Sequence, residues 1–336
     1  MPIVTTEHFK SGNLPLSKNG IPQVSEDDYC RLKGYMLETD DIVFSRVGSV
    51  DINAHVEHVQ QGWLFSGRVL RVRPIKSVNS LCLHYVLSTE SVKRDIRNRA
   101  VGQTMPSINT PILSNTGIYM SQSEAEQKKI ANLLSLIDER IATQNKIIDK
   151  LQSLIKGIRN DVFVKLRKSV GFNAMISDVL SYEQPQPYIV ENTEYTAEGI
   201  PVLTANKAFV LGYTSEINGI YDKDDCIIFD DFTLDCKYVD FPFKVKSSAI
   251  KILTAKNKEL LRYTFEFLKY LDLSTEEHKR HYIAETQNQE FILPTEQIVK
   301  TIAHIFSTLS VRMETAVKQR NVFEKQKQYL LRQMFI

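Results

Sequence analysis

Two stretches of this chain carry the same long apolar repeat, and this feature constrains the fold more than any other. Apolar residues recur from Ile130 to Val162 at alternating intervals of four and three residues, with Gln144 as the one polar member. A 3.5-residue period over such a length is typical of a helix whose seam is covered by another helix. Ser123 and Glu126 form a potential capping box at its start. The sequence therefore predicts a long helix over residues 122–168 that needs a helical partner.

The partner helix is predicted at the end of the chain, over residues 294–336. A second apolar series lies 172 residues further along on the same spacing, so that Ile130-Ala131 falls on Ile302-Ala303. We interpret the two helices as copies of one element, packed together as an antiparallel coiled coil. The residues expected to form the seam are Ile130, Leu134, Ile137, Ile141, Ile148, Leu151, Ile302, Phe306, Leu309, Met313 and Phe323.

The repeat extends into the segments that precede each helix. Their composition, with Val, Ile, Phe and Tyr between Gly and Asp turns, predicts short strands. The matched strings are Pro2-Ile-Val-Thr5 with Pro201-Val-Leu-Thr204, Asp41-Ile-Val-Phe44 with Asp225-Cys-Ile-Ile-Phe229, and Phe65-Ser-Gly-Arg68 with Phe243-Lys-Val-Lys246. The chain is thus predicted to be an α+β protein with a pseudo-twofold repeat, in which the two long helices separate two α/β domains.

Four segments follow from this reading: a first domain over residues 1–121, a helix over 122–168, a second domain over 169–293 and a helix over 294–336. The two domains are unequal at their starts. In the second domain 32 residues precede Pro201, whereas a single residue precedes Pro2. We therefore expect the first domain to lack the opening segment of the second.

Composition excludes several classes of protein. Of the 336 residues 43% are hydrophobic and 24% are charged, which is ordinary for a chain that forms a core. No apolar run approaches the length of a membrane span, and the first residues do not resemble a secretory signal. The four cysteines have no Cys-x-x-Cys spacing, so we expect reduced thiols in a cytoplasmic protein.

Charge is balanced in total but not along the chain. Residues 20–60 contain three basic and eight acidic side chains, whereas residues 66–105 contain eight basic and two acidic ones. Local basicity of this kind can attract nucleic acid even when the net charge is only +2. A solvated helix face explains the same pattern.

Several strings together resemble the specificity (S) subunits of type I restriction–modification systems. They are Asp41-Ile-Val-Phe-Ser-Arg-Val-Gly48, Gly62-Trp-Leu-Phe-Ser-Gly-Arg68, Gly102-Gln-Thr-Met-Pro-Ser-Ile-Asn109, Glu126-Gln-Lys-Lys-Ile-Ala131, Gly199-Ile-Pro-Val-Leu-Thr-Ala-Asn206, Ile228-Phe-Asp-Asp-Phe-Thr233 and Phe243-Lys-Val-Lys-Ser-Ser248. The resemblance covers the chain and rests on the combination of strings. The shortened first domain departs from the family pattern.

The resemblance implies a subunit that recognises double-stranded DNA and catalyses nothing itself. Two target-recognition domains would each read half of a split target, while the helices set the gap and dock methyltransferase (M) and restriction (R) subunits. S-adenosylmethionine, ATP and Mg²⁺ would bind those partners, and this chain none of them. Its sequence contains no Walker A loop and no methyltransferase signature. The helices or the incomplete first domain could also mediate self-association.

The candidate DNA contacts of the first domain lie in the matched strings and the basic stretch. Arginine can form paired hydrogen bonds with guanine, and a glycine-preceded loop can hold a phosphate. The candidates are Ser45, Arg46, Arg68, Arg71, Arg97, Gln103 and Thr104, with Arg94 and Arg99 as further phosphate contacts. Alternatively, Arg46 pairs with Asp40 or Asp41, and residues 102–104 form a plain turn.

The second domain offers a comparable set. It comprises Lys207, Tyr213, Asp231, Thr233, Lys237, Lys244, Lys246, Ser247, Ser248, Lys279, Arg280 and His281. Lys244 and Lys246 alternate along a predicted strand, which would place both amines on one face. A strand with surface ion pairs is the alternative. His278 and His281 lack a carboxylate partner in sequence and fit a polar surface better than a metal site.

Two other functions are compatible with the sequence. Asp225, Asp230 or Asp231, and Asp235 with Lys237 resemble the carboxylates and lysine of an Mg²⁺-dependent nuclease. The first domain lacks the matching second acid and lysine. A coiled-coil interaction protein that binds no DNA is the other alternative.

Overall fold

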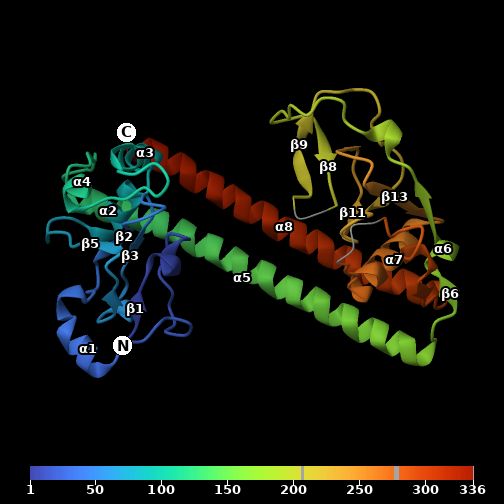
Figure 1. Cartoon of the computed structure of the whole chain (residues 1–336), viewed down its shortest axis with the longest axis horizontal. Coiled ribbons are helices and arrows are strands. Elements are labelled where there is room, and N and C mark those ends of the chain that lie inside the picture. The colour runs from blue at the N-terminus through green and yellow to red at the C-terminus, as the bar shows by residue number, and fades with distance from the viewer. Residues whose placement is uncertain (206–207, 276–279, 336) are drawn as a thin grey trace. The chain divides into compact units, whose positions relative to one another are not determined.

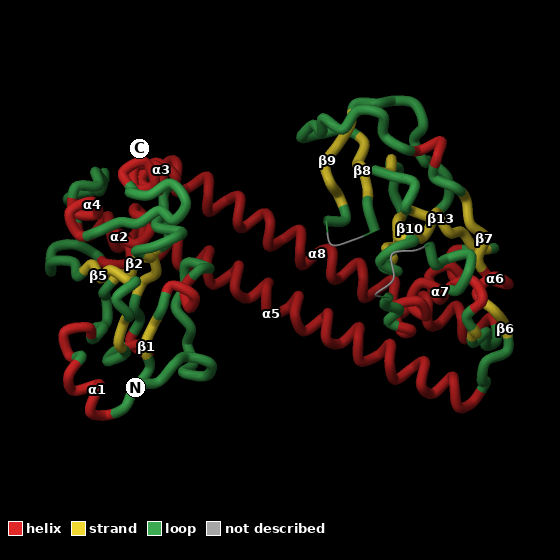
Figure 2. Tube along the Cα trace, in the orientation of Figure 1, coloured by secondary structure: helices red, strands yellow, loops and turns green. Residues whose placement is uncertain are grey.

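The computed structural model describes residues 1–205, 208–275 and 280–335 of the chain. The chain divides into two compact units: unit 1 comprises Met1–Asn145 and Lys318–Ile336, and unit 2 comprises Lys146–Val317. Each unit contains both helices and strands (Figure 1; Figure 2). The predicted α+β class is therefore confirmed.

Two helices are far longer than the rest, and each belongs to both units. Helix α5 (Glu124–Ser169) has 46 residues and α8 (Glu296–Met334) has 39, which gives lengths of about 70 and 58 Å at 1.5 Å per residue. Ser123 begins α5 as expected, because its Oγ accepts the Glu126 N–H at 3.4 Å. Within the described part of the chain, no helix is both long and apolar enough to cross a bilayer.

The two long helices pack together and run antiparallel. In unit 1 the first part of α5 contacts the last part of α8: Lys327 Nζ donates to Asp138 Oδ1 at 2.6 Å, and Arg140 stacks on Phe323. In unit 2 the order is reversed, with Arg159 of α5 stacked on Phe306 near the start of α8. The predicted packing of the helices is confirmed.

Every residue of the predicted seam is shielded from solvent. Leu134, Ile137, Ile148, Ile302, Phe306 and Leu309 are buried, and Ile130, Ile141, Leu151, Met313 and Phe323 are half-buried. Leu136, which lies beside the seam on the same helix, is 57% exposed. Burial is not confined to the predicted seam, because Phe163 of α5 and Leu331 of α8 are also buried.

Unit 1 is built around a three-stranded antiparallel sheet in the order β3-β2-β5 and a parallel pair of β1 with β4. Its elements are β1 (Ile3–Val4), α1 (Glu26–Arg31), β2 (Ile42–Ser45), β3 (Asn53–His55), β4 (Leu64–Phe65), β5 (Val69–Val72), α2 (Ser80–Leu87), α3 (Glu90–Arg99), α4 (Thr110–Ser114), the first part of α5 and the last part of α8. Both faces of β2 are covered. Val43 packs with Trp63 on one face, and Ile42 and Phe44 pack with α2 and α3 on the other.

Unit 2 contains a four-stranded sheet in the order β11-β10-β13-β7, a three-stranded sheet β12-β8-β9 and the pair β14-β6. Its elements are β6 (Ala174–Met175), α6 (Ile176–Val179), β7 (Leu180–Glu183), β8 (Ile200–Leu203), β9 (Val210–Thr214), β10 (Cys226–Asp230), β11 (Cys236–Val239), β12 (Lys244–Val245), β13 (Ile250–Ala255), α7 (Lys258–Leu271) and β14 (Glu290–Phe291), with the last part of α5 and the first part of α8. Phe229 and Leu253 face α7, whereas Ile228 and Ile252 face the smaller sheet.

The two units repeat one strand scaffold. The parallel pair of β1 with β4 corresponds to β8 with β12, and β3-β2-β5 corresponds to β11-β10-β13. The strand register corrects one alignment made from sequence. Val4 pairs with Phe65 and Leu203 pairs with Val245, so Phe65 corresponds to Val245 rather than to Phe243. Because both strings begin with Phe, the alignment by sequence similarity was shifted by two residues.

A buried histidine ties α2 to the sheet of unit 1. His84 Nδ1 donates to Asn53 Oδ1 of β3 at 2.6 Å, and Asn53 Nδ2 donates to Ser88 Oγ at 3.2 Å. Burial lowers the pKa of His84 to about 3, because the charged imidazolium cannot be solvated there. Unit 1 therefore folds around a neutral imidazole.

The seam makes a testable contribution to stability. We expect Leu134→Ala to lower the free energy of unfolding of unit 1 by about 2–5 kcal/mol, because the leucine is 0% exposed and its removal leaves a cavity. The fluorescence of Trp63, the only tryptophan in the sequence and buried in unit 1, reports this transition. Leu136→Ala on the exposed side of the same helix should change it by less than about 0.5 kcal/mol. Equal effects of the two substitutions would contradict the packing.

Acid should destabilise unit 1 through His84. The unfolded chain binds a proton near pH 6.5 and the folded unit does so only near pH 3, so stability is lost as the pH falls below 6.5. Between pH 7 and pH 5 the loss is about 2 kcal/mol. In Trp63-monitored denaturation, His84→Gln should flatten this dependence, whereas His58→Gln, at an exposed histidine, should retain it. An unchanged slope in His84→Gln would refute this account.

Candidate nucleic-acid interface

One group of exposed polar side chains in unit 1 gathers where β2 ends. The backbone of Arg46 bridges two segments: its N–H donates to Arg68 O at 2.9 Å, and its C=O accepts the Ile108 N–H at 2.9 Å. Gly48 N–H donates to Pro106 O at 2.8 Å and fixes the loop of residues 101–107 beside it. We call Arg46, Arg68, Gln103 and Thr104 the first basic surface; all four are exposed.

The first basic surface presents the donors that a nucleic acid requires. Arg46 makes one contact through its guanidinium, with Gly67 O at 3.2 Å. Among the described residues, no hydrogen bond or ion pair holds the Arg68 side chain, and neither Asp40 nor Asp41 pairs with Arg46. Free guanidinium groups beside a polar loop can reach base edges or phosphates.

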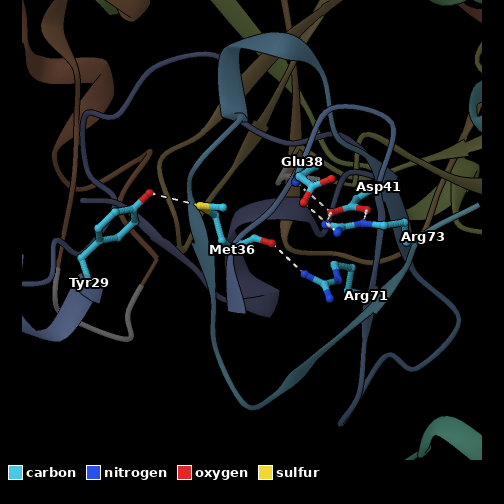
Figure 3. A network of polar contacts seen from close by, with 6 residues as sticks. All are labelled: Tyr29, Met36, Glu38, Asp41, Arg71 and Arg73. Atoms are coloured by element: carbon cyan, nitrogen blue, oxygen red, sulfur yellow. Dashed lines mark hydrogen bonds and ion pairs between the residues drawn. The ribbon is translucent and has the colours of Figure 1, made fainter. Parts of the chain in front are cut away.

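Four other candidates from unit 1 are engaged within the protein. Ser45 is buried, and its hydroxyl donates to Val47 O at 3.2 Å. Arg71 donates to Met36 O at 2.7 Å (Figure 3), and its guanidinium also lies over the Phe65 ring. Arg97 is held by Asp51 at 2.5 Å and by Glu90, and Arg99 by Asp95. Arg94 is exposed on the same helix. Some of the basic residues in this stretch therefore form ion pairs within the protein and are not available to a ligand.

Figure 3 also shows Arg73 beside Arg71. Its guanidinium forms a two-point pair with the buried carboxylate of Asp41, at 2.7 and 2.8 Å, and a third bond with Glu38 at 2.7 Å. These acidic partners raise the pKa of Arg73 further. The network fixes residues 36–41 to the end of β5 and takes both arginines out of the first basic surface.

Unit 2 presents a second group at the corresponding place. Asp231 follows β10 as Arg46 follows β2: its N–H donates to Ala249 O at 2.8 Å, and its C=O accepts the His281 N–H at 3.1 Å. The exposed side chains on these two flanking segments are Lys246, Ser247 and Arg280, which we call the second basic surface. Ser248 is half-buried beside them, and Lys207, His278 and Lys279 lie outside the described residues.

The structure corrects the prediction that Lys244 and Lys246 share one face. Lys244 is 3% exposed, and its amine donates to Asn218 O and pairs with Glu216, both at 2.7 Å. Strand β12 ends at Val245, so Lys246 lies on the loop beyond it. The bonds to Glu216 and to Asn218 O explain why the Lys244 side chain is turned into the protein.

Asp231 is likewise part of the framework rather than of the surface. It is 1% exposed, its Oδ1 accepts the N–H groups of His281 and Tyr282 at 3.1 and 2.8 Å, and its Oδ2 lies 3.7 Å from Lys251 Nζ. The His281 ring is also buried and bonds Glu285 at 2.9 Å. These contacts hold the segment that carries Arg280.

The remaining candidates of unit 2 lie elsewhere on the unit. Thr233 lines a groove of about 640 Å³ beside β11 together with Asp235 and Lys269. Lys237 is half-buried and 3.9 Å from Asp235, and Tyr213 on β9 is 36% exposed. Within the described part of the chain, no hydrogen bond or ion pair joins any of them to Lys246.

The carboxylates of the nuclease alternative are separated and occupied. Asp225 accepts bonds from Tyr238 and Lys258, Asp230 Oδ1 accepts two backbone N–H groups of the following turn, and Asp235 pairs with Lys269 at 2.7 Å. Over the described ranges, no group of three or more His, Cys, Asp or Glu side chains could hold a metal ion. The arrangement gives the nuclease hypothesis no support.

Two side chains next to these surfaces were missed from the sequence. Ser49 is exposed in the turn that Gly48 anchors to Pro106, and Phe232, one residue after Asp231, is 37% exposed. Ser49 directly follows the string Asp41–Gly48, and Phe232 lies within the string Ile228–Thr233. The repeat itself was the signal that could have identified them.

Comparisons with known proteins agree with this arrangement. Residues 1–153 match the type I restriction modification DNA specificity domain family. A 126-residue segment is 44% identical to the specificity subunit of a type I restriction enzyme from Escherichia coli and covers 35% of this chain and 31% of that protein. A 178-residue segment is 29% identical to the MjaX specificity subunit of Methanocaldococcus jannaschii, over 49% of this chain and 39% of that one.

The fold of the chain also has a solved counterpart. The S subunit of a type I restriction–modification system from M. genitalium superposes with a TM-score of 0.66 at 17% identity, over 90% of this chain and 84% of that one. The resemblance to type I specificity subunits is confirmed by the match of residues 1–153 to their DNA specificity domain and by the similarity to the E. coli subunit. The matched segments span about a third of the length of the two relatives compared by sequence.

The two exposed arginines Arg68 and Arg97 provide a matched test of the first basic surface. We expect Arg68→Ala to weaken binding to a duplex that carries the motif methylated in the host, by about 1–3 kcal/mol if it reads a base, or to lower the salt slope by about one if it contacts phosphate. Arg97→Ala should leave affinity unchanged, because Asp51 and Glu90 already hold that side chain. Fluorescence anisotropy over a salt series measures both. Loss of binding in Arg97→Ala alone would reverse the assignment.

Proposed function

We propose that this chain is the DNA sequence-recognition subunit of a type I restriction–modification complex. Residues 1–121 and 169–293 act as two target-recognition domains, and each reads one half of a bipartite target. The long helices over residues 122–168 and 294–336 set the gap between the halves. The alternatives of a nuclease and of an interaction protein without DNA binding have no comparable support.

One observation carries this proposal. Each unit repeats the same strand scaffold and presents exposed basic side chains on segments fixed to the same backbone position, Arg46 in unit 1 and Asp231 in unit 2. Equivalent positions that carry different side chains suit two half-sites of different sequence. The match of residues 1–153 to the DNA specificity domain family supports the same conclusion.

Chemistry in this complex would be left to other subunits. Methyltransferase and restriction subunits would bind S-adenosylmethionine, ATP and Mg²⁺, and this chain would position them on double-stranded DNA. Its four cysteines are free, as is usual in the reducing cytoplasm where such a complex would act. Methyl transfer by the purified chain alone would contradict this division of roles.

The proposal that the long helices set the gap between the two half-sites can be tested in the host. A heptad inserted after Asn145 in α5 and another after Val317 in α8, where the helices pass between units, lengthen both helices by about 10 Å. That length corresponds to about three base pairs at 3.4 Å each. Sequencing that detects methylated bases should show the same two half-sites with a gap about three base pairs longer. Deleting the gene should abolish methylation at the motif.

A control insertion of the same size distinguishes the effect of longer helices from the effect of adding residues to the chain. Seven residues inserted after Lys76, in the exposed loop between β5 and α2, should leave the gap unchanged. A motif with its original gap in the helix variant, or with altered half-sites, would show that the helices do not set the spacing.

A further inference from the structure

In unit 2 one short segment completes two strand pairings. Residues 174–183 form β6, α6 and β7 in succession. Strand β7 pairs antiparallel with the outer edge of β13, and β6 pairs antiparallel with β14. Between them, Ile176 and Val179 of α6 are buried against the core that includes Phe267 and Phe291. The segment closes one side of the unit.

Unit 1 contains counterparts of both partner strands. Strand β5 pairs with β2 as β13 pairs with β10, and in each unit an Asn-capped helix follows, begun by Asn79 or Asn257. Residues 117–120 precede α5 as residues 289–292 precede α8, so Tyr119 occupies the position of Phe291. Among the described residues, no strand pairs with the outer edge of β5, which is the end strand of its sheet (Figure 2).

The buried Phe291 of unit 2 consequently has an exposed counterpart in unit 1. Phe291 is 0% exposed, whereas Tyr119 is 78% exposed and its neighbour Ile118 is 39% exposed. A groove of about 430 Å³ lies between β5, α2 and this segment. Its apolar lining consists of Leu70, Val72, Leu83, Leu87, Leu113 and Ile118.

The backbone of β5 offers a free hydrogen-bonding edge beside this groove. Ser45 N–H of β2 donates to Ile52 O on the β3 side, so Phe44 and Ile42 bond Leu70 and Val72 on the β5 side. Arg71 between them therefore directs its N–H and C=O outward. Its counterpart Ile252 directs the same groups to Glu183 of β7.

We propose that this surface of unit 1 binds a peptide segment of a second polypeptide, which adds an antiparallel strand to β5 and places apolar side chains in the groove. The segment has the chemistry of residues 174–183: extended, then one helical turn with two apolar side chains, then extended. A sheet edge next to an apolar groove suits strand addition, in which backbone bonds give affinity and pockets give specificity.

A different chain is the better donor than a second copy of this one. Residues 174–183 of any copy are already held by two strand pairings, and Ile176, Val179 and Leu180 are buried in their own unit. Releasing them would expose as much apolar surface as docking would cover. This inference concerns the fold of unit 1 and does not depend on DNA recognition.

A synthetic peptide of residues 174–184 is the direct probe. Added to the full chain, it should bind saturably with a stoichiometry of one, measured by calorimetry, and protect the amide of Arg71 from hydrogen exchange. In unit 2 Ser181 and Glu183 face Thr254 and Ile252, so N-methylation at these two residues should weaken binding at least about tenfold. N-methylation at Tyr182, whose N–H points away from the neighbouring strand, is the matched control and should not.

Variants of the protein test the groove. Ile118→Asp and Tyr119→Asp place charges at exposed positions, so they should lower peptide affinity at least about tenfold while leaving the Trp63-monitored unfolding midpoint unchanged. Absence of binding, or equal effects of all N-methylated peptides, would overturn the proposal. A dimer in light scattering that the peptide dissociates would also overturn it and assign the surface to a second copy.

Discussion

A helix with a continuous apolar stripe is not stable alone in water. The rest of this structure depends on how two such helices bury each other's apolar stripes. Alone, α5 would expose Leu134, Ile137 and Ile148, all of which are buried in the folded chain. Helix α8 supplies the complementary stripe and runs in the opposite direction. Because each helix enters both units, every unit contains one end of each. The helices are therefore part of both cores and not a linker between finished domains.

In each unit, a helix that follows the sheet packs on the ends of the long helices. In unit 1 Tyr85 of α2 packs with Leu134 and Leu331 and donates to Asp138 of α5 at 2.8 Å. In unit 2 Tyr263 at the equivalent place in α7 packs on Phe163 of α5. Glu266, which is 1% exposed, is compensated by Arg159 of α5 and Arg262 of α7. A buried carboxylate is stable only with such partners, so the charge pairs fix how α7 sits on the long helices.

The charged residues divide into two populations with different roles. One population is engaged in ion pairs within the protein: Lys244 with Glu216, Asp231 with Lys251, and Arg73 with Asp41 hold loops and strand ends in place. The other remains free on the loops that the first population positions, at Arg68 in unit 1 and Lys246 in unit 2. The proposed recognition of DNA would need both, because a free guanidinium reads a base edge only if its backbone is held still. The two units also differ, since β7 pairs with the outer edge of β13 in unit 2 whereas no described strand pairs with the outer edge of β5 in unit 1.

The sequence by itself determined the long helices, their common register and the existence of two related units, because a 3.5-residue apolar period leaves few alternatives to paired helices. The family resemblance followed from strings spread along the chain. Tertiary structure alone decided which basic residues face solvent. Lys244 and Lys246 look alike in sequence, yet one is enclosed by Glu216, and this carboxylate lies 28 residues away along the chain. The alignment of Phe65 with Phe243 failed for a related reason, because strand register is set by cross-strand hydrogen bonds that local similarity does not record.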